Sequence, residues 1–130
     1  MLHALAVLLL FSTVAAQADT PDGCQPDQTP ALLNGFRDIG DLLGSDTVGV
    51  PLDCEHSNPQ GAPNDTTQTT SAGAFFYYKF NNLVVFSDQQ SHHWATAHDG
   101  IVTWTGLQPF PPEVGSTLHP WASLTPGQAP

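Results

Sequence analysis

The side chains best suited to hold a ligand are aromatic rings and planar polar groups that gather in one stretch of the sequence. Sugars are commonly bound by this combination, because their C–H faces stack on flat rings while their hydroxyl groups exchange hydrogen bonds with amides and carboxylates. Trp94 is the aromatic residue least easily explained as core, since polar residues flank it. The predicted ligand-binding residues are Phe75, Tyr77, Asp88, Gln90, His93 and Trp94.

The same stretch has a structural interpretation. A small sheet needs aromatic side chains to fill its core, and alternation along the chain gives that role to most of Phe76, Tyr78, Phe80, Phe86 and Trp104. The alternative to a binding module is therefore a structural or protein-interaction domain in which every aromatic side chain is buried.

Histidines are the residues that could hold a metal. Five of them follow residue 18: His56, His92, His93, His98 and His119. Zinc needs three or four converging ligands, whereas neighbouring His92 and His93 would point to opposite faces of a strand. A site would have to combine distant segments, for example His56 with His92 and Asp99. We expect no cofactor, and a metal-dependent hydrolase is the third interpretation.

Signatures of hydrolytic enzymes are missing from the sequence. It contains neither a G-x-S-x-G motif nor an H-E-x-x-H motif. Glycoside cleavage needs only two carboxyl groups about 5 to 10 Å apart. Candidates are Asp53, Glu55, Asp88 and Asp99, but nothing in the sequence singles out two of them. We expect the protein not to be an enzyme.

Charge limits the classes of partner. The chain has 130 residues, with 12 Asp and Glu against 2 Lys and Arg, which gives a net charge of −10. No basic patch can form, so nucleic acid and anionic membranes are poor partners. Charged residues make up only 11% of the chain, against about 25% in ordinary domains. Beyond Asp65 the only acidic residues are Asp88, Asp99 and Glu113, so the aromatic half is nearly neutral.

The N-terminus predicts secretion. Residues 5–14 form an apolar run interrupted only by Ser12 and Thr13, and Ala16 and Ala18 occupy the small-residue positions of a signal-peptidase site. We therefore predict a signal peptide over residues 1–18 and an extracellular or periplasmic location. The run is too short to span a bilayer, which needs about 20 apolar residues, and the mature chain has no comparable segment.

Cys24 and Cys54 are the only cysteines. In an oxidising compartment an isolated pair most simply forms one disulfide, which would stabilise the fold by about 3 to 4 kcal/mol. The sequence has no C-x-x-C motif that would indicate a catalytic or metal-binding pair.

One amphipathic helix is predicted between Thr29 and Gly44. Thr29 suits the N-cap, Pro30 the first helical position and Gly44 the C-terminal stop. Apolar residues recur at helical spacing: Leu32, Leu33, Phe36, Ile39, Leu42 and Leu43. Before the helix lies an extension over residues 19–28. After the domain, which covers residues 29–106, a Pro-rich tail over residues 107–130 reads as extended or disordered.

The rest of the domain predicts an antiparallel meander. Strands are expected at residues 47–52 (an edge or bend because of Pro51), 66–70, 74–80, 83–87 and 101–105. Asn81 and Asn82 suit a two-residue hairpin turn, across which Lys79 could pair with Asp88. One face of the 74–80 strand should pack on the helix, and the other should curl or bind a ligand. The fold class is α+β.

Several short motifs resemble a small secreted bacterial module that occurs alone or appended to extracellular enzymes of the cell envelope. They are G-x-P in residues 49–51, Glu55-His56, Q-x-T-x-x-G in residues 68–73, Y-x-K in residues 77–79, Phe86-Ser87-Asp88, and the final Trp104. Gln89 departs from the pattern, which has a turn glycine there. The resemblance implies a β-rich, non-catalytic module and assigns no ligand. The expected partner, a cell-wall glycan or an envelope protein, follows instead from the aromatic and amide side chains of a secreted chain with few charges.

Overall fold

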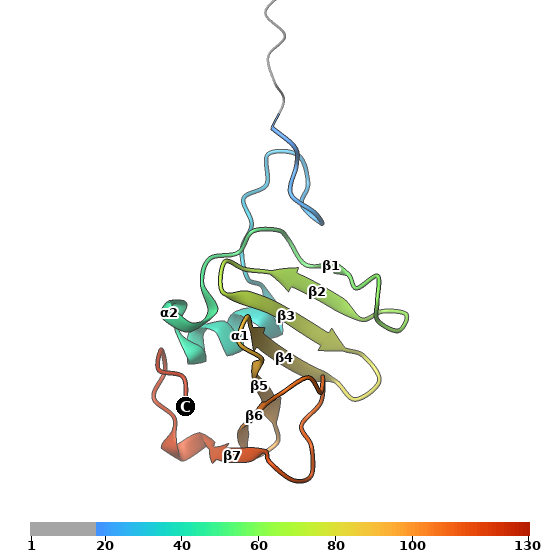
Figure 1. The fold of residues 1–130 in the computed structure, drawn as a ribbon. Helices are drawn as coiled ribbons and strands as arrows, with labels where there is room; N and C mark the ends of the chain where they lie inside the picture. The colour runs from blue at the N-terminus through green and yellow to red at the C-terminus, as the bar shows by residue number, and fades with distance from the viewer. Residues whose placement is uncertain (1–17) are drawn as a thin grey trace, which may run out of the picture.

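The computed structural model describes residues 18–130, so the predicted signal peptide lies outside the described residues except for Ala18. Seven antiparallel strands form one sheet in which each strand pairs with the next along the chain (Figure 1). They are β1 (His56–Ser57), β2 (Thr66–Thr69), β3 (Gly73–Tyr78), β4 (Leu83–Asp88), β5 (His92–Ala97), β6 (Gly100–Thr105) and β7 (Thr117–Pro120). The helices are α1 (Asn34–Leu43), α2 (Ser45–Val48) and the 3-10 turn η1 (Trp121–Ser123).

Helix α1 covers one face of the sheet, which we call the helix-covered face (Figure 1). Phe75 is fully buried there, and its ring lies 5.2 Å from Phe36 of α1 and 4.8 Å from Phe86 of β4. The core on this face consists of Phe36, Ile39, Leu43, Val48, Phe75, Phe86, Trp94 and Ile101. Three of these eight residues come from α1, Val48 comes from α2, and the sheet supplies the other four.

The opposite face, which we call the open face, has a smaller core made of Val85, Ala95 and Trp104. The segment between β6 and β7 packs against this face. Trp104 Nε1 donates a hydrogen bond of 2.8 Å to the Gln108 carbonyl, and the Phe110 ring lies 4.7 Å from the Tyr78 ring. The irregular segment after β6 therefore covers part of the open face.

The predicted combination of one helix of several turns with an antiparallel meander is confirmed, although the sheet dominates the fold. Strands β1, β5 and β7 were not predicted. The strand expected over residues 47–52 is wrong: residues 45–48 form α2, and only Pro51 forms a bridge, to Thr70. Pro51 lacks the N–H that a continuing ladder would need.

The predicted start of the helix is also wrong. Helix α1 begins at Asn34, five residues after the expected N-cap at Thr29. Gln68 explains the delay, because its Nε2 donates a hydrogen bond of 2.9 Å to the Ala31 carbonyl and thereby holds the preceding segment against β2. This tertiary contact overrides the local N-cap and proline signals.

The turn between β3 and β4 is longer than predicted. Four residues, 79–82, separate the paired Tyr78 and Leu83. The Lys79 N–H donates to Asp65 Oδ1 at 2.8 Å, which removes Lys79 from the ladder. The predicted pairing of Lys79 with Asp88 is wrong, because Asp88 lies opposite Gly73 at the other end of the hairpin.

Part of the segment expected as a Pro-rich tail is folded. Strand β7 pairs with β6 from Thr103↔Thr117 to Gly100↔Pro120. The chain then returns to the end of α1, where the Gly127 N–H donates to the carbonyls of Asp41 and Leu42 (Figure 1). The approach is close enough to require a glycine at residue 44: its φ is 86°, and a Cβ there would lie 2.3 Å from the Gly127 carbonyl oxygen.

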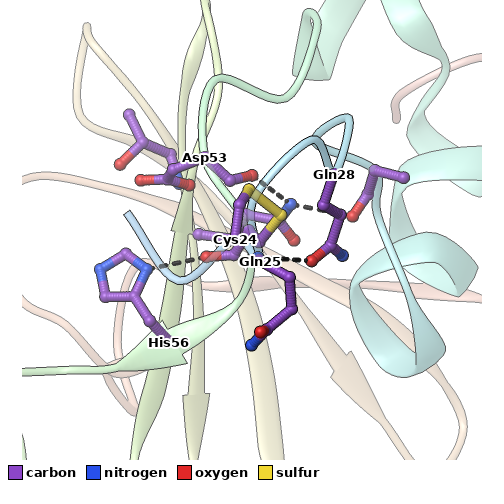
Figure 2. Close-up of a disulfide and its surroundings, with 9 residues drawn as sticks. Cys24, Gln25, Gln28, Asp53 and His56 are labelled. Atoms are coloured by element: carbon purple, nitrogen blue, oxygen red, sulfur yellow. Dashed lines mark hydrogen bonds between the residues drawn. A yellow bond between two sulfur atoms is a disulfide. The ribbon is translucent and has the colours of Figure 1, made fainter. Parts of the chain in front are cut away.

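The predicted disulfide between Cys24 and Cys54 is confirmed, with 4.9 Å between the two Cα atoms (Figure 2). Around it, His56 Nδ1 donates to the Cys54 carbonyl at 2.8 Å, and the Cys54 N–H donates to the Asp22 carbonyl at 2.9 Å. The disulfide therefore attaches the N-terminal extension to the segment that enters β1. Within residues 18–130, no helix has the length and apolar character needed to cross a membrane.

Candidate functional site

The six predicted ligand-binding residues do not converge on one surface. Phe75 is fully buried, and Trp94 and His93 are only 9% and 8% exposed. Tyr77 is half-buried on the helix-covered face, while Asp88 and Gln90 lie at the turn between β4 and β5. Phe75 and Trp94 belong to the core, which leaves no stacking platform made of Phe75, Tyr77 and Trp94.

Asp88 shapes the β4–β5 turn. Its Oδ1 accepts hydrogen bonds from the backbone N–H groups of Gln90 at 2.9 Å and His92 at 2.8 Å, and its Oδ2 lies 2.9 Å from His92 Nδ1. Partial burial by itself would raise the pKa of Asp88, but the hydrogen bonds from His92 and Gln90 outweigh it and lower the pKa below its ordinary value. The carboxylate is thus a structural turn cap.

This depressed pKa makes the turn's contribution to stability depend on pH. The folded-state pKa lies below the unfolded one, so the stabilisation is present above about pH 4 and is lost as the pH falls through the folded-state value. We expect urea denaturation to give wild type a higher free energy of unfolding than Asp88→Asn at pH 5. This difference should shrink as the pH is lowered through the folded-state pKa of Asp88. Gln90→Ala keeps the backbone N–H and should leave the pH dependence unchanged. A pH-independent difference between wild type and Asp88→Asn would contradict the assignment.

His93 is also committed to the fold. Its Nε2–H donates to the Gly106 carbonyl at 2.7 Å, so in the neutral ring Nδ1 accepts from Ser87 Oγ at 2.6 Å. The ring stacks on Trp104, with centroids 4.9 Å apart. The Ser87–His93 pair has the spacing of a nucleophile and its base. Because the ring is 8% exposed and both nitrogens are occupied, we interpret the pair as a link between β4, β5 and the chain after β6.

The structure does bring aromatic and amide side chains together, but on the open face and with other residues. They line a depression of about 420 Å³, which we call the aromatic groove. Its walls are Asn58, Gln60, Gly61, Ala62, Asp65, Phe76, Tyr78, Phe80, Pro109 and Phe110. Phe80 is 72% exposed and meets Phe110 edge to face, with 5.6 Å between ring centroids.

Three parts of the chain position the groove. Strand alternation directs Phe76 and Tyr78 away from the helix-covered face that Phe75 and Tyr77 occupy. The 58–65 loop forms one wall and is held by Asp65, which is 4% exposed and accepts from the Ala62 N–H at 3.0 Å. The segment after β6 supplies the other wall.

Most of the polar side chains that line the groove carry no charge. Burial and the nearby Asp65 carboxylate raise the pKa of Tyr78, so its phenol stays protonated at neutral pH. The Asp65 carboxylate oxygens are both engaged by backbone N–H groups. Within the described residues, the side chain of Gln60 and the Nδ2 of Asn58 form no hydrogen bond and are available to a ligand.

Sequence reasoning missed these residues because it assigned Phe76, Tyr78 and Phe80 to the core. The available signal was that both faces of the 74–80 strand carry aromatic side chains. Only one face could pack on the single predicted helix. Phe110, in the Pro-rich segment, had no signal of its own.

Over residues 18–130 no three His, Cys, Asp or Glu side chains form a group that could hold a metal ion. Comparison with protein-family models, curated proteins and solved structures found no match to this chain.

Proposed function

We propose that the protein is a secreted, non-catalytic module that binds an uncharged carbohydrate of the cell envelope through the aromatic groove. The observation that carries the proposal is the gathering of Phe76, Tyr78, Phe80 and Phe110 along one open depression whose walls also hold free amide groups. The disulfide is compatible with an oxidising compartment, as secretion requires.

The solvent exposure of the Phe80 ring supports ligand binding more strongly than the number of aromatic rings in the groove does. Phe80 leaves most of its surface in water although Phe110 lies within contact distance, so the pair presents apolar surface that a partner could cover. A sugar ring placed there would stack its C–H face on the aromatic surface. Its hydroxyl groups would meet the Tyr78 phenol and the amides of Asn58 and Gln60.

Charge favours a neutral ligand. Asp65 is the one acid of the groove, and it is buried and used by the loop backbone. Neither Arg37 nor Lys79 lines the groove, so no cation there would attract an anionic polymer. An uncharged glycan fits these walls better than a phosphate-rich or uronic-acid polymer.

The proposal is tested by a glycan array and by retention on isolated cell walls. We expect Phe80→Ala or Phe110→Ala to weaken retention about tenfold, as stacking contributions of this kind predict. Leu107→Ala is the matched control, because Leu107 is 95% exposed on the same segment and lies outside the groove. Retention that is absent in wild type, or equal in the groove variants and the control, would overturn the proposal.

A structural or protein-interaction domain is the second candidate, and the burial of Phe75 and Trp94 favours it. It predicts no retention on any glycan. Variants at Phe80 and Phe110 would then change only the capture of an envelope protein.

A further inference from the structure

A second cleft lies on the helix-covered face, at the N-terminal end of α1. Its volume is about 480 Å³. The floor is a row of side chains across three strands, Tyr77 of β3, Val84 of β4 and Thr96 of β5. The walls are the start of α1, including Phe36 and Asp38, together with Glu55 and Asn82. The sheet separates this cleft from the aromatic groove.

Two carboxylates face the α1 cleft without a basic partner. Glu55 is partly buried and accepts one hydrogen bond, of 2.6 Å, from Thr66 Oγ1. Asp38 is exposed at the rim. Within residues 18–130 no Lys or Arg forms a salt bridge, since the ion pairs found involve only His92 and His98. The charge of both carboxylates is therefore left for solvent or for a ligand.

An aromatic side chain lies beside these carboxylates and is held in place. The Tyr77 hydroxyl donates a hydrogen bond of 3.0 Å to Asn82 Oδ1, and Asn82 itself has a φ of 53° at the end of the β3–β4 turn. The Tyr77 side chain, like that of Val84, packs against the core. The cleft thus combines an ordered aromatic ring, an apolar floor and two negative charges.

We propose that the α1 cleft binds a small organic cation, an alkylammonium or quaternary ammonium group. Such cations combine apolar methyl or methylene surface with a positive charge and are held by aromatic rings and carboxylates together. The backbone N–H groups at the start of α1 carry about half a positive charge, which is less than the two carboxylates supply. The net charge of −10 further favours the approach of cations.

The test uses choline as the probe and follows amide resonances of the 15N-labelled protein. We expect millimolar choline to shift signals from the start of α1, Tyr77 and Thr96, and the shift to weaken as NaCl screens the carboxylates. The neutral isostere 3,3-dimethyl-1-butanol has the same shape without the charge. It should bind about tenfold more weakly, as the loss of the cation's electrostatic attraction predicts.

Single-residue variants separate the contributions of the carboxylates and of the Tyr77 ring to choline binding. Glu55→Gln, which keeps an oxygen for the Thr66 hydrogen bond, and Asp38→Asn should each weaken choline binding about threefold to fivefold. Tyr77→Phe keeps the ring and should retain binding, whereas Tyr77→Leu should lose it; thermal unfolding checks that both variants are folded. Glu113→Gln is the control, since it removes one exposed charge outside the cleft.

Absence of shifts at the cleft, equal binding of the neutral isostere, or equal effects of Glu55→Gln and Glu113→Gln would each overturn the proposal. These outcomes are independent of the aromatic groove, because the groove lies on the opposite face and its variants leave the α1 cleft intact.

Discussion

Replacing Phe75 with alanine is expected to lower the free energy of unfolding by about 3 to 5 kcal/mol. Phe75 is fully buried, and its ring contacts Phe36 of α1 and Phe86 of β4. Alanine would leave a cavity where the helix meets the sheet, and only a shift of α1 toward β3 and β4 could close it. Urea denaturation followed by circular dichroism and tryptophan fluorescence measures the change.

The matched control is Phe80→Ala on the same chain segment. Phe80 is 72% exposed, so its removal is expected to change the free energy of unfolding by less than about 1 kcal/mol. If Phe75→Ala does not fold, Phe75→Leu gives a smaller loss that can be measured. Equal effects of the two alanine variants would contradict the assignment of Phe75 to the core and of Phe80 to the groove.

The meander could be predicted because its signals are local. Alternating aromatic and β-branched residues mark β3, β4 and β6, and each of these strands begins or ends within two residues of the prediction. Strand β5 has a weaker signal, since its sequence HHWATA mixes polar and small residues. It is a strand because β4 and β6 pair with it on both sides. Such pairing cannot be predicted from the sequence of one segment alone.

The location of the candidate site depends on which face the helix covers. Sequence alternation separates Phe75 and Tyr77 from Phe76 and Tyr78, but both pairs are aromatic. The choice between them is made by packing of Phe36 against Phe75, a contact between segments about forty residues apart. The sequence therefore identified the strand that carries the candidate site, but it assigned the buried Phe75 to the ligand-binding face.

The second wall of the groove shows a different limit of prediction from sequence. Phe110 lies in a segment whose prolines suggest disorder, yet the same segment continues into strand β7, which begins at Thr117. Pro120 is tolerated because it ends an edge strand, where no further strand needs its missing N–H. Composition described this segment correctly as proline-rich but could not show that β6 offers it an unpaired edge.

The disulfide variant Cys24→Ser/Cys54→Ser is expected to unfold about 3 to 4 kcal/mol more easily than wild type. For a domain of this size the loss corresponds to a fall in Tm of about 10 to 15 °C. The covalent link closes a long loop in the unfolded chain and so reduces its conformational entropy. Thermal unfolding with and without a reducing agent measures the effect, and the reducing agent should have no effect on the double variant.

Loss of the disulfide should also loosen a contact that no cysteine makes. The N-terminal extension leads into the segment whose Ala31 carbonyl accepts from the buried Gln68 amide, and that amide also donates to the Asp53 carbonyl at 2.8 Å, beside the disulfide (Figure 2). Once the extension is released, the Gln68 amide loses the Ala31 carbonyl in a fully buried position and keeps only Asp53, which is costly. Hydrogen exchange should therefore rise in β2 before it rises in β4. Uniform exchange, or a change in Tm below about 3 °C, would show that noncovalent contacts alone hold the extension.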